Sequence, residues 1–119
     1  MEIVTAAEIV TQQIEAYNRR DLEANMALFS DDFKIVNLSD GNILVDGKGA
    51  CRKMYSDLFL SSPKLFAEVI SRIDFHHKVV LHEYIYGRNG STERVEQLIV
   101  FEIQNNKIEK IIRLWNPEN

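Results

Sequence analysis

The sequence predicts an α+β fold in which three helices pack on one face of an antiparallel sheet of about six strands. Apolar residues recur at helical spacing in the first half of the chain. After Pro63, apolar and polar residues alternate in segments that Asn- and Gly-containing turns separate. Helices that precede a long run of strands favour an α+β architecture with the helices on one side of the sheet.

The first helix is expected to run from about Thr5 to Asn18. Apolar side chains share one face of it, at Ile9, Val10, Ile14 and Tyr17. Thr5 and Glu8 have the spacing of a capping box, in which each side chain satisfies a backbone donor at the helix start. Asp21 is placed to cap a second, short helix that carries Leu22, Met26 and Phe29.

A strand from Phe33 to Leu38 and a return strand from Ile43 to Val45 come next, with Asp40-Gly41 as the hairpin turn between them. A third helix follows, with an apolar stripe from Ala50 to Phe59, and Ser61-Ser62-Pro63 ends it. The remaining strands are expected at 69–75, 78–87, 94–104 and 107–115.

Alternation separates the faces of the last three strands. One face mixes aromatic, polar and apolar groups: Val80, His82, Tyr84, Tyr86, Val95, Gln97, Ile99, Phe101, Ile111, Arg113 and Trp115. This mixture predicts the wall of a partly polar pocket. The other face is mainly apolar: Val79, Leu81, Glu83, Ile85, Glu96, Leu98, Val100, Ile112 and Leu114.

The apolar face predicts a homodimer through the outer side of the sheet, because three short helices can cover only the inner side and a large apolar surface is rarely left in water. The residues expected in this interface are Leu81, Ile85, Leu98, Val100, Ile112 and Leu114.

Length and charge narrow the function classes. The 119 residues suit one domain, 1–119, and the net charge of −4 argues against nucleic acid and against attraction to anionic membranes. The single cysteine, Cys51, excludes an internal disulfide. Neither a signal peptide nor an apolar run of membrane-spanning length is visible, so a cytoplasmic protein is expected.

Two stretches, Gln13 to Leu22 (QIEAYNRRDL) and Ala27 to Phe33 (ALFSDDF), together resemble the N-terminal signature of nuclear transport factor 2-like proteins. Segment 45–50 resembles that family's entry into its third helix, and 107–115 resembles its last strand. The resemblance covers nearly the whole chain. It implies a cone-shaped fold, a deep pocket between helices and sheet, and frequent dimers, but no single function.

Two enzyme groups within this resemblance have recognisable catalytic residues. At the ketosteroid isomerase positions this chain has Gln13, Asn37 and Ile99, which cannot supply the tyrosine, the base and the protonated acid of that reaction. At the limonene epoxide hydrolase positions it keeps an asparagine, Asn37, but has Tyr84, Tyr86 and Arg113 in place of the Asp-Arg-Asp set. Neither mechanism is therefore expected.

Two function classes remain open. The first is a binding module for a small organic ligand. Arg113 would favour an acidic ligand, because a guanidinium matches a carboxylate. The second resembles the SnoaL-like polyketide cyclases, with His82 as general base and Arg113 or a tyrosine stabilising an oxyanion. The expected pocket residues are Tyr17, Asn37, Tyr84, Tyr86, Gln97, Ile99 and Trp115. No metal or other cofactor is expected, because the histidines lack metal-site spacing.

Overall fold

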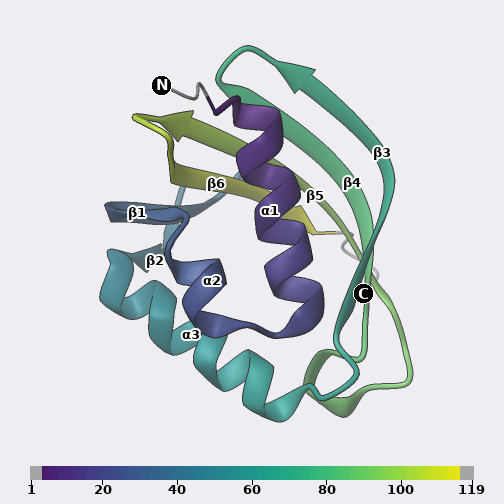
Figure 1. The fold of residues 1–119 in the computed structure, drawn as a ribbon. Helices are drawn as coiled ribbons and strands as arrows, with labels where there is room; N and C mark the ends of the chain where they lie inside the picture. Colours follow the sequence, from purple (N-terminus) through teal and green to yellow (C-terminus); the bar gives the residue numbers. More distant parts are fainter. Residues whose placement is uncertain (1–3, 116–119) are drawn as a thin grey trace.

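The computed structural model describes residues 4–115, except for the side chain of Trp115. The helices in this range are α1 (Ala6–Arg19), α2 (Leu22–Met26) and α3 (Lys48–Ser61), with a short 3₁₀ turn, η1 (Arg88–Gly90). The strands are β1 (Phe29–Asn37), β2 (Ile43–Asp46), β3 (Phe66–Phe75), β4 (Lys78–Tyr86), β5 (Val95–Gln104) and β6 (Lys107–Trp115). The predicted α+β cone is confirmed (Figure 1).

The six strands form one sheet in the order β2-β1-β6-β5-β4-β3. Strands β3 to β6 form an antiparallel meander, as predicted. The pairing between β1 and β6 is parallel, so the expectation of an antiparallel sheet is wrong for this pair of strands. The long segment between these two strands allows this arrangement, because parallel neighbours need a crossover connection rather than a hairpin.

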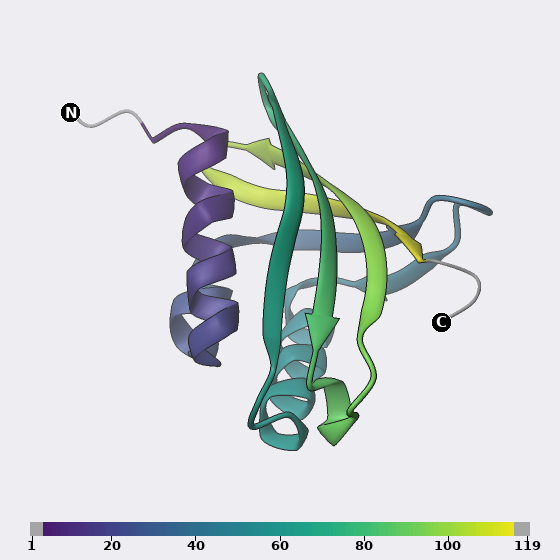
Figure 2. The same cartoon turned by 90° about the vertical axis from the view of Figure 1, so that its right-hand side faces the viewer.

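The sheet is strongly curved, and the helices lie on its inner side (Figures 1 and 2). Aromatic side chains fill the space between them. Phe29 and Phe33 of β1 are fully buried, with ring centroids 4.6 Å apart, and Tyr55 of α3 packs 5.6 Å from Phe29. Phe29 was expected on the second helix. It starts β1 instead, because α2 ends at Met26 and a buried strand residue can stack on Phe33.

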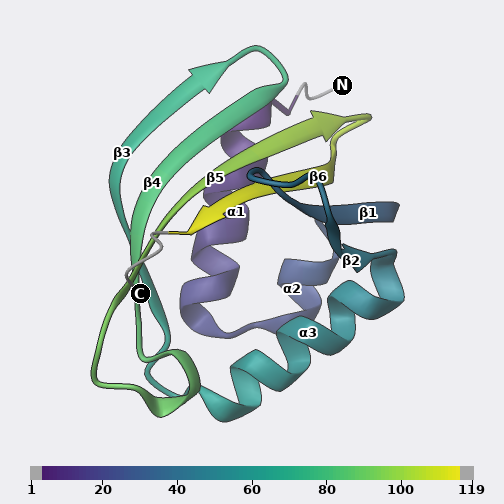
Figure 3. The ribbon, with the colours of Figure 1, turned by 180° about the vertical axis from the view of Figure 1, so that it is seen from behind.

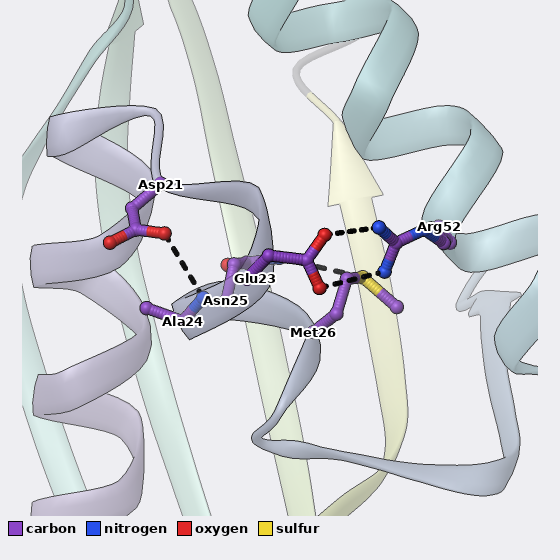
Figure 4. Close-up of polar contacts among 6 residues, drawn as sticks. All are labelled: Asp21, Glu23, Ala24, Asn25, Met26 and Arg52. Carbon is purple, nitrogen blue, oxygen red and sulfur yellow. Dashed lines mark hydrogen bonds and ion pairs between the residues drawn. The ribbon is translucent and has the colours of Figure 1, made fainter.

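The two N-terminal helices begin at the predicted caps. The Thr5 hydroxyl accepts a hydrogen bond from the backbone N–H of Glu8 at 3.1 Å, and the Asp21 carboxylate accepts one from Ala24 at 3.1 Å. An ion pair between Glu23 and Arg52 joins α2 to α3 (Figure 4). The Asp21 cap satisfies a backbone donor at the start of this five-residue helix.

The prediction of which β4 residues point to the inner side of the sheet is wrong. Val79, Leu81, Glu83 and Ile85 are the buried residues of this strand, and His82, Tyr84 and Tyr86 alternate with them on the outer side. The register explains the difference, because Glu83 lies opposite Gln97 and Leu81 lies opposite Ile99 on β5. Directly paired residues project to the same face of a sheet.

The outer side of β3, β4 and β5 has no helix in front of it in Figure 2, and Figure 3 shows the same sheet from behind the view of Figure 1. Leu98, Val100 and Ile112 are partly buried on this side, and Leu114 is exposed. Leu81 and Ile85 were expected here but belong to the core, because the odd-numbered residues of β4 point to the inner side of the sheet. The homodimer through the outer face stays a prediction. None of the helices described is long and apolar enough to cross a membrane.

Candidate functional site

A pocket of about 490 Å³ lies between the helices and the inner face of the sheet. Helices α1 and α3 form one wall, strands β4, β5 and β6 form the opposite wall, and η1 contributes Arg88 and Asn89. Ten of the eighteen described lining residues are apolar or aromatic, and the other eight are polar or charged. Pockets of this size and composition are typical of small-molecule binding sites.

Glu83 is the acidic side chain in the sheet wall of this pocket. It is only 4% exposed, and its Oε1 accepts a 2.6 Å hydrogen bond from Nε2 of Gln97, which lies directly opposite on β5. Burial raises the pKa of the Glu83 carboxyl, while the Gln97 hydrogen bond and the charge of Arg88 partly oppose this rise. A pocket carboxyl with a raised pKa is a common feature of acid–base sites.

Arg88 enters the pocket from η1, which is fixed against the end of α3. The backbone N–H of Asn89 donates to the Ser62 hydroxyl at 2.8 Å, and the Ser61 hydroxyl donates to Oδ1 of Asn89 at 2.7 Å. Gly87 adopts a φ of +75°, and a Cβ there would lie 2.5 Å from the carbonyl oxygen of Lys64. The turn that carries Arg88 therefore depends on close approach to the end of α3.

Arg113 lies on the inner face of β6, opposite Ile99 of β5, and lines the same pocket. Burial lowers the pKa of the Arg113 guanidinium, and the like charge of Arg88 adds to this effect. The two guanidinium groups therefore repel each other electrostatically within the pocket. Such a pair favours a negative charge between them.

Tyr17 of α1 and Tyr55 of α3 form the aromatic part of the helix wall. Their ring centroids are 6.3 Å apart in an edge-to-face arrangement. Burial raises the pKa of Tyr55 well above its ordinary value and also raises the pKa of Tyr17, where the charge and a hydrogen bond of Arg88 oppose the rise. Both phenols are therefore neutral near pH 7 and can act as hydrogen-bond donors.

Gln13 of α1 also borders the pocket, but its side chain has a structural partner. Its Nε2 donates a 3.0 Å hydrogen bond to Oδ1 of Asn25, which is completely buried on α2. This amide pair connects α1 to α2 and orients Gln13 toward the helices. The residue at the position of the isomerase tyrosine therefore stabilises the fold in this chain.

The structure places four of the predicted site residues along the pocket, namely Tyr17, Gln97, Ile99 and Arg113. Whether they contact a ligand stays a prediction. The side chain of Trp115 lies outside the described part of the structure. Asn37 is not among the lining residues, because it ends β1 and forms the hairpin, where its backbone N–H donates to the carbonyl of Asn42 and its carbonyl accepts from Gly41.

His82, Tyr84 and Tyr86 lie outside the pocket, and the expectation that they line it is wrong. On the outer face, Nε2 of His82 is 2.7 Å from a carboxylate oxygen of Glu96. The guanidinium of Arg94 lies 3.9 Å over the Tyr84 ring, and the Tyr86 hydroxyl donates to Glu68 at 3.1 Å. His82 consequently cannot act as a base on a ligand in this pocket.

Glu83 and Arg88 were missed as site residues. The sequence pattern could have identified Glu83, because it is the single charged residue in the alternating set that also contains the apolar positions 79, 81 and 85. A charged side chain in such a set points to a buried polar site. Arg88 lies in a turn, where alternation gives no information. Within the described residues no group of three or more His, Cys, Asp or Glu side chains could hold a metal ion.

Solved structures with this fold come from several bacteria. An uncharacterized cystatin-fold protein from Novosphingobium aromaticivorans has a TM-score of 0.84 at 20% identity, covering 94% of this chain and 99% of that one. An NTF2-like protein of unknown function from Cytophaga hutchinsonii has a TM-score of 0.79 at 14% identity, covering 98% and 95%. A protein with a ketosteroid isomerase-like fold from Catenulispora acidiphila, solved in complex with trimethylamine, has a TM-score of 0.74 at 15% identity, covering 92% and 86%.

At these identities the likeness establishes the fold alone. No curated protein sequence matches the chain. The family model of the SnoaL-like domain matches residues 10–111, from within α1 to within β6, and this range includes the pocket residues described above except Arg113. The chain therefore belongs to the SnoaL-like domain family.

Proposed function

We propose that this protein binds a small organic molecule in the inner pocket and exchanges a proton with it at Glu83. The observation that carries this proposal is the position of Glu83, a nearly inaccessible carboxyl in the pocket wall. Burial of that carboxyl raises its pKa, which makes the carboxylate a stronger base than an exposed one. The protein would then be an enzyme of the acid–base class.

The reaction that suits these groups is removal of a proton from a carbon next to a carbonyl. The Glu83 carboxylate accepts the proton, and the electron pair of the broken C–H bond moves to the carbonyl oxygen. Arg88, Arg113 and the phenols of Tyr17 and Tyr55 line the same pocket and could stabilise that oxygen. Return of the proton to the same or another carbon completes an exchange or an isomerisation.

Hydrogen–deuterium exchange tests this proposal directly. Small ketones, lactones and keto acids are first screened for binding by their effect on the melting temperature. Each ligand that binds is then incubated with the protein in D₂O, and loss of the proton signal next to the carbonyl is followed by NMR. We expect exchange with the wild type and a loss of at least about 100-fold with Glu83→Gln, since an amide cannot accept the proton.

Glu93→Gln provides a matched control, because Glu93 is an exposed loop residue outside the pocket. Exchange should be unchanged in this variant. Equal exchange rates for the wild type and Glu83→Gln would contradict the proposed role of Glu83.

The second candidate is a binding module without catalysis. It is favoured by the apolar and aromatic residues of the pocket lining and by the side-chain pairs that Gln13 and Glu83 already make. A ligand that binds in the pocket with no proton exchange, in the wild type as in Glu83→Gln, would support this candidate over the enzyme.

A further inference from the structure

We infer that the pocket is specific for small organic acids and that Arg113 and Arg88 together bind the carboxylate of the ligand. The inference names the substrate class of the proposed function and rests on it only for the orientation of the ligand relative to Glu83. The binding of acids has its own structural basis, which is the convergence of two guanidinium groups from separate elements on one pocket.

The sheet places Arg113 on the same inner face as the Glu83 carboxyl, with β5 between the two residues. Glu83 on β4 pairs with Gln97 on β5, and Arg113 on β6 pairs with Ile99, two positions along the same strand from Gln97. Carboxyl, amide and guanidinium therefore lie diagonally across three neighbouring strands on the inner face. Gln97 and Arg113 are diagonal neighbours on adjacent strands, and Glu83 lies one strand further, so one small ligand in the pocket can lie between Glu83 and Arg113.

Arg88 belongs to η1, which follows the end of β4, and the backbone of this turn is held by contacts with the neighbouring chain. The hydrogen bonds of Asn89 to Ser61 and Ser62 hold the turn against α3, as does the close approach of Gly87 to Lys64. A binding group that is already ordered loses little conformational entropy when the ligand arrives. Arg88 is thus suited to contact an anion that Arg113 also contacts.

The charges in the pocket favour an anion over a neutral ligand. The lining contains four ionisable acid and guanidinium side chains, which are Asp57, Glu83, Arg88 and Arg113, together with Tyr17 and Tyr55. Asp57 forms an exposed ion pair with Lys53 on α3. Glu83 already accepts a 2.6 Å hydrogen bond from Nε2 of Gln97, while Arg88 and Arg113 bring two positive charges to the interior. A carboxylate accepts two parallel hydrogen bonds from a guanidinium, and such bonds are stronger in a confined site than in water.

Matched pairs of acids and amides test the inference. The probes are phenylacetate, 3-phenylpropionate and phenylpyruvate, compared with phenylacetamide and 3-phenylpropionamide. We expect the acids to raise the melting temperature by several degrees and the amides to leave it unchanged, since a ligand that binds only the folded state stabilises it. Equal shifts with acids and amides, or no shift with any acid, would overturn the inference.

Three variants identify the contacts. Arg113→Met and Arg88→Met should each weaken binding of the acids by at least about 10-fold in calorimetry. Arg94→Met should not, because Arg94 lies over the Tyr84 ring on the outer face. Unchanged affinity in Arg113→Met would overturn the role of that residue.

A measurement on the wild type covers the case in which Arg113→Met does not fold. Arginine side-chain Nε–H signals are followed by NMR during titration with phenylacetate. Shifts of the Arg88 and Arg113 signals, with the Arg94 signal unmoved, support the inference, and a titration that moves neither pocket arginine overturns it.

The two proposals can fail separately. Acids that bind through the arginines but show no deuterium exchange would support the binding of acids by Arg88 and Arg113, here called the acid site. The same result would contradict proton transfer at Glu83. A neutral ketone that exchanges its proton in a Glu83-dependent way, without any effect of Arg88→Met or Arg113→Met on its binding, would support proton transfer and contradict the acid site.

Discussion

Nε2 of Gln97 donates a 2.6 Å hydrogen bond to Oε1 of Glu83 from the directly opposite position on the neighbouring strand. The two side chains are 7% and 4% exposed, respectively, so the bond is shielded from water. Burial and this bond have opposite effects on the carboxyl, because burial raises its pKa and the bond to Gln97 lowers it. Substitutions at the two positions should therefore have different and measurable consequences.

Glu83→Gln should make the folded protein more stable than the wild type at neutral pH. The folded pKa of Glu83 is raised above its ordinary value of 4.5, so the folded state holds its proton more tightly than the unfolded state. Wild-type stability should then decrease as the pH rises from about 4.5 through the folded pKa. Urea denaturation between about pH 4 and pH 8 measures this effect.

The stability difference between the two proteins should vanish near pH 4, where Glu83 is protonated in both states. Glu93→Gln, on the exposed loop, should follow the wild type at every pH. A Glu83→Gln variant that is less stable than the wild type at neutral pH would show that the charged carboxylate stabilises the fold, contrary to this prediction.

Gln97→Leu should raise the pKa of Glu83 further. The substitution removes the hydrogen bond that favours the carboxylate. Burial of the carboxyl, which raises its pKa, remains. Carboxyl ¹³C chemical shifts of Glu83, recorded during a pH titration, measure the midpoint. Gln104→Leu is the control, since Gln104 is exposed at the end of the same strand. A midpoint that stays constant or falls in Gln97→Leu would disprove the proposed effect of the bond.

Much of the fold could be predicted from the sequence, because local signals define its elements. The capping residues Thr5 and Asp21 place the first two helices within one or two residues of their observed starts. The last strand was predicted with its observed bounds, since polar turn residues flank it on the N-terminal side. Both signals act over short distances along the chain and do not depend on tertiary packing.

The face that β4 buries could not be predicted from the sequence. Most of the pocket wall therefore could not be predicted either. The face that a strand buries is set by its register against the neighbour, and the loop from Gly87 to Arg94 is too long to fix that register. Both faces of β4 were chemically plausible, since one offers His82 and two tyrosines and the other offers three aliphatic residues. Glu83 was the informative residue, because a carboxyl in an aliphatic set must be paired or functional.

Gly87→Ala should destabilise the protein strongly and weaken the acid site together with it. The residue has a φ of +75°, and the added Cβ would meet the backbone carbonyl of Lys64 at 2.5 Å. The unfavourable φ alone costs roughly 1–2 kcal/mol, and the overlap with a fixed backbone atom adds to it. Urea denaturation gives the loss in the free energy of unfolding.

Gly90→Ala separates the two causes. Gly90 has nearly the same φ, +77°, but no atom lies within 4 Å of its added Cβ. This variant should lose only about 1–2 kcal/mol. If both variants lose the same stability, the contact between Gly87 and Lys64 does not anchor η1, and the preorganisation of Arg88 is unsupported.

Leu98→Glu should keep the protein monomeric if the outer sheet face forms the expected homodimer. Leu98 lies on that face between His82 and Leu114 in the strand register, and a new charge buried at this point of an interface opposes association. Light scattering should give twice the chain mass of 13.8 kDa for the wild type and the chain mass for the variant. Leu60→Glu is the control, since Leu60 is 83% exposed on α3, away from the sheet, and should leave the dimer intact. A wild-type protein with the mass of one chain at micromolar concentration would contradict the dimer and leave the outer face exposed to solvent.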